Sequence, residues 1–105
     1  MLFRSEAARK LAERMIREGG SAPADRLTRG FRLAAARRPT AEELEVMRKL
    51  QEDFASMYAR DKAAAGKLLA IGEARRDEKI DPVELAAWTM TANMILNLDE
   101  AITKE

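Results

Sequence analysis

The stretch of sequence that decides the fold is Asp81 to Glu105, DPVELAAWTMTANMILNLDEAITKE. Asp81 can accept hydrogen bonds from the free amides of a first helical turn, and Pro82 suits the first helical position because its missing N–H would have no partner there. Glu84 places a negative charge near the positive end of the helix dipole. The apolar side chains that follow keep mostly three- and four-residue spacings: Leu85, Trp88, Ala92, Ile95 and Leu96. This pattern predicts an amphipathic helix over about residues 82–97.

The chain before Asp81 shows the same helical periodicity, with no alternating run long enough for a convincing strand. In the first segment the repeated apolar positions are Ala8, Leu11, Ala12, Met15 and Ile16. A length of 105 residues allows one domain but not comfortably two. We therefore expect one all-α domain over 1–105, a compact bundle of about five helices without a sheet, with helices at about 6–17, 23–36, 41–60, 62–71 and 82–97.

Local signals mark several helix ends. Gly19-Gly20 is expected to end the first helix. Thr40 and Glu43 have the spacing of a capping box, in which each side chain accepts from the other residue's backbone N–H. Asp61 is expected to cap the fourth helix, and Gly72 to end it.

The third segment carries the longest regular apolar stripe: Leu44, Met47, Leu50, Phe54 and Met57. We expect this helix to be the longest and to form the spine of the fold. Met15, Met47 and Met57 are interpreted as core residues rather than as a docking groove or as ligands to haem, and Trp88 as a buried anchor.

Composition excludes several kinds of chemistry. The chain contains neither cysteine nor histidine, which rules out disulfides, Cys/His zinc sites, haem attachment through Cys-x-x-Cys-His and histidine base catalysis in these residues. The 19 basic and 18 acidic residues leave a net charge of +1, which gives no bulk attraction to nucleic acid or to an anionic membrane. No apolar run reaches the length of a membrane span, and no signal peptide is recognisable. We expect no cofactor and no enzymatic activity.

The first five residues, Met1 to Ser5, are expected not to be native. Leu-Phe-Arg-Ser is what a common sequencing-library adapter encodes when it is translated in one frame. The chain is therefore expected to be the C-terminal part of a longer protein.

Two parts of the chain resemble a known family. The phrases lie in Arg29 to Glu43 (RGFRLAAARRPTAEE) and in Asp81 to Glu105, where Glu84-Leu85-Ala86-Ala87-Trp88 and Asn97-Leu98-Asp99-Glu100 stand out. They resemble the C-terminal domain of large planctomycete-type multidomain proteins of unknown function, many of which have an upstream cytochrome-c-like domain. The resemblance covers roughly residues 6–105. It implies an exported protein, but no haem-binding motif lies in these residues, so it implies no redox chemistry for them.

Five arginines form a candidate basic face on and just after the second helix: Arg26, Arg29, Arg32, Arg37 and Arg38. Such a face can grip phosphates. No glycine-rich loop or interleaved aromatic surface accompanies it, which favours a solvated face paired with neighbouring acids. Nucleic-acid binding is the weaker alternative.

Four polar residues near the C-terminus form a second candidate cluster, which the apolar pattern does not explain: Asn93, Asn97, Asp99 and Glu100. Asn93 and Asn97 lie four residues apart and share a helical face. Acids at a helix C-terminus meet the negative end of the dipole and need compensation. One interpretation is internal, with arginines of the second helix or Asn97 as a C-cap satisfying the cluster. The other is a recognition site or a seam against an upstream domain.

Two functions of different classes follow from these patterns. The favoured one is a non-catalytic helical module that packs against upstream domains of a parent protein or against other protein subunits. The alternative is a domain that contributes polar residues such as Asn97, Asp99 or Glu100 to a site built mainly by upstream domains.

Overall fold

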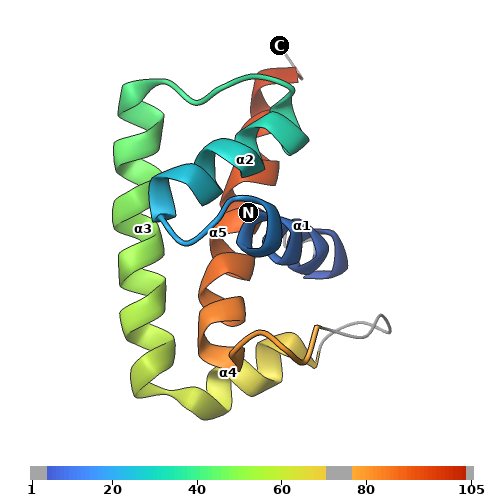
Figure 1. Cartoon of the computed structure of the whole chain (residues 1–105), viewed down its shortest axis with the longest axis vertical. Coiled ribbons are helices and arrows are strands. Elements are labelled where there is room, and N and C mark those ends of the chain that lie inside the picture. Colours follow the sequence, from blue (N-terminus) through green and yellow to red (C-terminus); the bar gives the residue numbers. More distant parts are fainter. Residues whose placement is uncertain (1–4, 71–76, 104–105) are drawn as a thin grey trace.

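The computed structural model describes residues 5–70 and 77–103, with side chains at 6–70 and 77–98. Over these residues the chain forms five α-helices and no strand (Figure 1): α1 (Ser5–Glu18), α2 (Pro23–Ala35), α3 (Ala41–Arg60), α4 (Lys62–Leu69) and α5 (Pro82–Thr103). The predicted all-α bundle of five helices is confirmed. None of these helices combines the length and the apolar character that a membrane crossing requires.

Helix α5 is the centre of the bundle, because it packs against each of the other four helices. Consecutive residues from Leu85 to Thr89 are all buried, so every face of α5 is covered there. The hydroxyl groups of the buried Thr89 and Thr91 donate to the carbonyls of Leu85 and Ala87 at 2.7 and 2.9 Å, which satisfies them within the helix. A central helix of this kind tolerates polar residues only when they are bonded locally.

The expectation that the third helix is the longest and forms the spine is wrong. Helix α5 has 22 residues and α3 has 20. The predicted end of α5 at residue 97 is six residues too early, because Asn97 does not cap the helix. Its Nδ2 donates to the carbonyl of Asn93 at 2.8 Å inside a helix that continues to Thr103.

The predicted N-caps are confirmed. The Thr40 hydroxyl accepts from the Glu43 N–H at 3.1 Å, and the Glu43 carboxylate accepts from the Thr40 N–H at 2.9 Å, which completes the capping box. Asp61 accepts from the N–H of Ala64 at 3.0 Å, and Asp81 accepts from the N–H of Glu84 at 3.1 Å. Each cap satisfies amides that a helix leaves free at its start.

The ends of α2 and α4 differ slightly from the prediction. Helix α2 ends at Ala35 because Ala36 adopts a left-handed conformation with φ of 57°, a position that ordinarily favours glycine. Helix α4 ends at Leu69. The predicted stop at Gly72 lies outside the residues that the structure describes, as do Met1 to Arg4 of the segment Met1 to Ser5 that was predicted to be non-native.

The buried face of α3 is rotated from the predicted one. Met15, Met47 and Trp88 are buried as expected, but Met57 is 42% exposed, so its assignment to the core is wrong. Instead, Gln51 and Tyr58 are buried with Met47. The other predicted stripe residues, Leu44, Leu50 and Phe54, are partly buried and pack against the core as expected.

Candidate functional site

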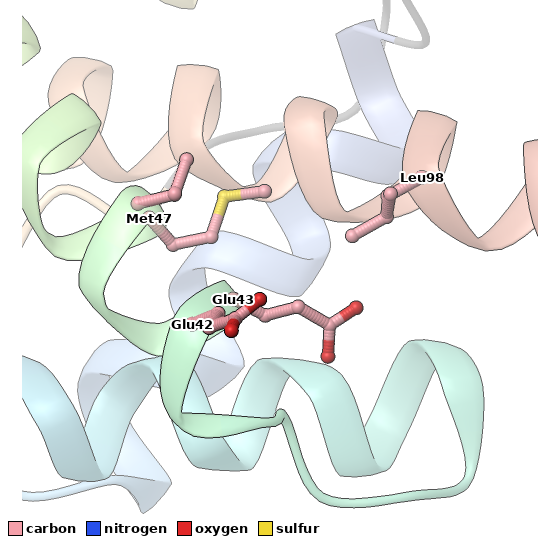
Figure 2. A pocket seen from close by; sticks show the side chains of 5 residues that line it. Glu42, Glu43, Met47 and Leu98 are labelled. Carbon is pink, nitrogen blue, oxygen red and sulfur yellow. The ribbon is translucent and has the colours of Figure 1, made fainter.

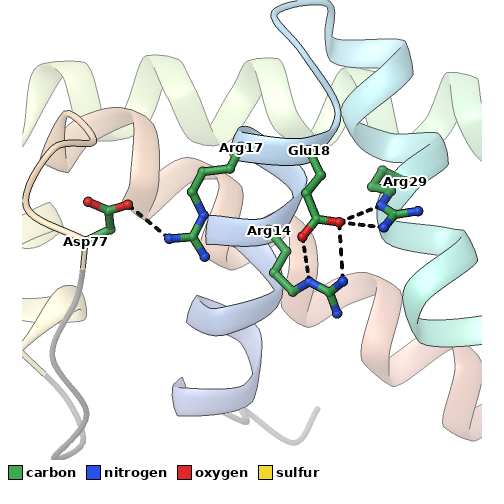
Figure 3. A network of polar contacts seen from close by, with 5 residues as sticks. All are labelled: Arg14, Arg17, Glu18, Arg29 and Asp77. Carbon is green, nitrogen blue, oxygen red and sulfur yellow. Dashed lines mark hydrogen bonds and ion pairs between the residues drawn. The ribbon is translucent and has the colours of Figure 1, made fainter.

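The candidate basic face is largely committed to holding helices together. Figure 3 shows Glu18 at the end of α1 between Arg14 of the same helix and Arg29 of α2. The Glu18 carboxylate accepts from Arg14 Nε at 2.8 Å and from Arg29 Nε at 2.9 Å. These hydrogen bonds, that of Arg14 first, lower the pKa of Glu18 from 4.5 to about 2. Arg29 therefore joins α2 to α1.

Arg26 joins α2 to the start of α5. Its Nη1 donates to Glu84 at 2.6 Å, its Nε donates to the carbonyl of Gly20 at 2.6 Å, and its guanidinium lies 5.6 Å from the centre of the Trp88 ring. The side chain is only 13% exposed. A guanidinium with a carboxylate, a carbonyl and an aromatic face as partners is part of the packed structure.

Arg37 holds the start of α3. It donates two hydrogen bonds to Glu43, at 2.7 and 2.8 Å, and lies 5.4 Å from the centre of the Phe31 ring. The bond from Arg37, followed by that from the Thr40 backbone, lowers the pKa of Glu43 from 4.5 to about 2. Arg32 and Arg38 remain exposed at the surface. The structure therefore pairs Arg26, Arg29 and Arg37 with acids, but Arg26 is largely buried rather than solvated.

The structure describes the side chains of two residues of the predicted polar cluster, Asn93 and Asn97. Asn93 is 1% exposed, which places its amide inside the bundle. Asn97 is partly buried, and its Nδ2 bonds the Asn93 carbonyl one turn back. The side chains of Asp99 and Glu100 lie outside the described residues. A buried Asn93 fits a structural role better than contact with a partner.

Two buried charges on α1 were missed by the sequence reasoning. Arg9 and Glu13 are 2% and 1% exposed. Arg9 Nη1 donates to the carbonyl of Leu69, the last residue of α4, at 2.9 Å, and the Glu13 carboxylate accepts from the N–H of Asp77 at 2.6 Å. Periodicity assigns both positions to the polar side of an amphipathic helix. In the folded chain each of them bonds a backbone group about 60 residues further along the sequence.

A hollow of about 290 Å³ lies where the first turns of α3 meet the second half of α5. It is lined by Glu42, Glu43, Val46, Met47 and Leu98. Figure 2 shows Met47 on α3 and Leu98 on α5 bordering this space, with the two glutamates on the first turn of α3. The lining is mainly apolar, and its size suits one or two side chains rather than a drug-sized ligand.

Val46 extends the hollow onto the outside of α3, where it is 56% exposed. It shares a surface with five other residues, all of them exposed: Glu42, Lys49, Asp53, Met57 and Arg60. We call these six residues the outer face of α3. In Figure 1 this helix forms one edge of the molecule, with α5 on its inner side. The sequence pattern did not mark this face, because Val46 falls outside the apolar stripe assigned to the core but Met57 falls inside it.

The charges on α3 fall into two groups. Arg48 binds Glu45 at 2.8 Å and also pairs with Glu52, so this trio is satisfied along the helix. Within the described part of the chain, Glu42, Lys49, Asp53 and Arg60 form no ion pair. All four belong to the outer face.

The residues described by the structure contain no group of three or more aspartates or glutamates arranged to hold a metal ion. Burial raises the pKa of the Tyr58 hydroxyl. No protein-family model, curated protein or solved structure matches this chain.

Proposed function

We propose that this chain is a non-catalytic helical module that binds another protein surface through the outer face of α3. The observation that carries the proposal is the exposure of Val46 and Met57, 56% and 42%, on one face of a helix whose opposite face is already buried. A single exposed apolar residue is ordinary in a soluble protein. Two of them on one helical face, one lining an apolar hollow, fit the pattern of anchor residues in helix-mediated recognition.

The outer face is dispensable for the core. Met47, Gln51 and Tyr58 supply the buried side of α3, which packs against α5, α2 and α4. Val46 and Met57 therefore add little to the stability of the isolated fold, which leaves contact with a partner as the role that uses them.

The resemblance to the C-terminal domain of planctomycete-type multidomain proteins supports a particular setting. In that setting the module forms the C-terminal part of a larger exported protein, and its partners are upstream domains of the same protein or other subunits. The proposal for the outer face of α3 does not depend on this setting.

Site-directed photocross-linking tests the proposed function. The photoreactive amino acid benzoylphenylalanine would replace Val46 or Met57 in separate variants and Lys67 in a control, because Lys67 is exposed on α4 away from the outer face. Each variant would be expressed in the native cells, irradiated, and its products identified by mass spectrometry. We expect positions 46 and 57 to give the same defined protein product, which position 67 does not give.

The cross-linked protein would then be purified and its affinity for the chain measured by calorimetry. Val46→Glu should weaken binding at least about tenfold while circular dichroism shows an unchanged fold. Cross-linking at positions 46 and 57 no stronger than at position 67, or binding unaffected by Val46→Glu, would refute the proposed function.

A further inference from the structure

The outer face of α3 carries the same three-residue pattern twice. An acid, an apolar residue and a base occur at Glu42, Val46 and Lys49, and again eleven residues later at Asp53, Met57 and Arg60. Eleven residues make just over three helical turns, so the two triplets lie on nearly the same side of a straight helix. All six residues are exposed.

The face presented by one helix matches the same face of a second copy that runs in the opposite direction. When a second α3 lies antiparallel to the first, Glu42 faces Arg60 of the second copy, and Lys49 faces Asp53. Val46 then faces Met57 of the second copy. A two-fold axis repeats each of these pairs, so all six residues of both copies acquire a partner of matching character.

We infer that the outer face of α3 binds a second copy of this chain, forming an antiparallel two-fold dimer. The inference rests on the proposed function and names its partner. The charges support it, since Glu42, Lys49, Asp53 and Arg60 form no ion pair among the described residues, whereas Glu45, Arg48 and Glu52 on the same helix are paired.

The hollow beside Val46 provides space in which the contact between Val46 and Met57 of the second copy can be buried. In the antiparallel register Met57 of the second copy lies against Val46, at the edge of the space lined by Met47 and Leu98. Methionine is unbranched and flexible, and it suits an irregular apolar gap. One helix pair buries a small area, so the dimer should be weak and should form reversibly with concentration.

Analytical ultracentrifugation of the full chain, from about 10 μM to about 1 mM, tests self-association. We expect a monomer–dimer equilibrium. Glu42→Arg alone or Arg60→Glu alone sets like charges opposite each other twice in the dimer and should raise the Kd at least about tenfold. The double variant exchanges the two signs and should restore the wild-type Kd. Lys67→Glu, a charge reversal away from this face, should leave the Kd unchanged.

Disulfide trapping tests the register. The native chain lacks cysteine, so introduced thiols are the only ones present. Positions 46 and 57 lie about three turns apart on one helix, roughly 16 Å, too far for a bond within one chain. The double variant Val46→Cys with Met57→Cys should give a disulfide-linked dimer on mild oxidation, whereas each single variant should give far less.

A chain that stays monomeric up to about 1 mM overturns the dimer. So does a dimer that the Glu42→Arg, Arg60→Glu double variant fails to restore, or one that the single-cysteine variants trap as readily as the double variant. If the chain is monomeric and positions 46 and 57 cross-link to a different protein, self-association is wrong and the proposed function stands. If those positions cross-link to nothing above the control, both are wrong.

Discussion

Gly19, the residue after α1, lies directly against the backbone of Arg26 in α2. A Cβ atom on Gly19 would stand 2.7 Å from the Cα of Arg26 and 2.6 Å from the carbonyl oxygen of Met15. Both distances are shorter than real Cβ contacts, and both opposing atoms belong to backbone that cannot move aside by a side-chain rotation. The turn between α1 and α2 therefore depends on the missing side chain at this position.

Gly19→Ala should lower the free energy of unfolding by about 1–3 kcal/mol, because the new methyl group forces α1 and α2 apart. Gly66→Ala is the matched control, since a Cβ at this helical position in α4 meets nothing within 4 Å. The control should gain about 0.5–1 kcal/mol from helix propensity. Urea denaturation followed by circular dichroism measures both. Equal effects of the two substitutions would contradict the close contact.

Gly30 should show a coupling with Met15. A Cβ on Gly30 would lie 2.7 Å from Met15 Cε and 3.1 Å from Ile95 Cδ1, and both of these side chains are fully buried. Gly30→Ala should therefore destabilise the wild-type chain by roughly 1–3 kcal/mol, and much less in a Met15→Ala background, where the space is empty. A double-mutant cycle in urea measures the difference. Additive effects would show that the two residues do not compete for the same space.

Glu13 should stabilise the fold through its bond to the N–H of Asp77. Glu13→Ala leaves that amide without its acceptor and should cost about 1–3 kcal/mol. Glu13→Gln keeps a side-chain oxygen at the same place and should cost less. Hydrogen exchange at the Asp77 amide is the specific readout, and we expect it to accelerate in Glu13→Ala more than in Glu13→Gln. Unchanged exchange in both variants would contradict this role.

Acid should destabilise the bundle partly through Glu18 and Glu43. Both carboxyl groups have a folded-state pKa of about 2, lowered from 4.5 by their arginine partners. A depressed pKa means that the stabilisation is complete above the unfolded-state value and is lost as the pH falls from about 4.5 toward 2. The melting temperature of the double variant Glu18→Gln, Glu43→Gln should therefore fall less than that of the wild type over this range. Melting temperatures that fall equally with pH in the wild type and the double variant would contradict this role of Glu18 and Glu43.

The rotated face of α3 predicts opposite outcomes for two methionines. Met47 is 6% exposed and Met57 is 42% exposed. Met47→Ala should cost about 2–5 kcal/mol, whereas Met57→Ala should stay within about 0.5 kcal/mol of wild type. Thermal unfolding measured at low micromolar concentration separates the loss of folding stability from any effect on self-association. A comparable loss in both variants would place Met57 in the core after all.

The helix starts could be predicted because they are local. Thr40, Asp61 and Asp81 each bond an amide three residues further along the chain, so the spacing of residue types already contains the interaction. Helix ends were less predictable. Asn97 has the residue type of a C-cap, yet its amide bonds within a helix that continues for six residues.

The candidate sites depended more on the fold. The basic series on α2 was visible, but its acidic partners, Glu18 and Glu84, come from α1 and α5. The hollow and the outer face of α3 were not predicted, because they depend on which side of α3 turns toward α5. Periodicity placed Leu50 correctly against the core, but it also assigned the exposed Met57 to the core and missed the buried Gln51 and Tyr58.

The sequence by itself determined the all-α class, the number of helices and where each of them begins, because apolar spacing and capping are interactions within one segment. Only the tertiary structure decided that α5 is central, that Arg9 and Glu13 are buried, and that Val46 and Met57 face outward. Those outcomes depend on contacts between segments far apart in the chain, such as the 2.6 Å bond between Glu13 and the N–H of Asp77. No local pattern encodes which neighbour will cover a given face.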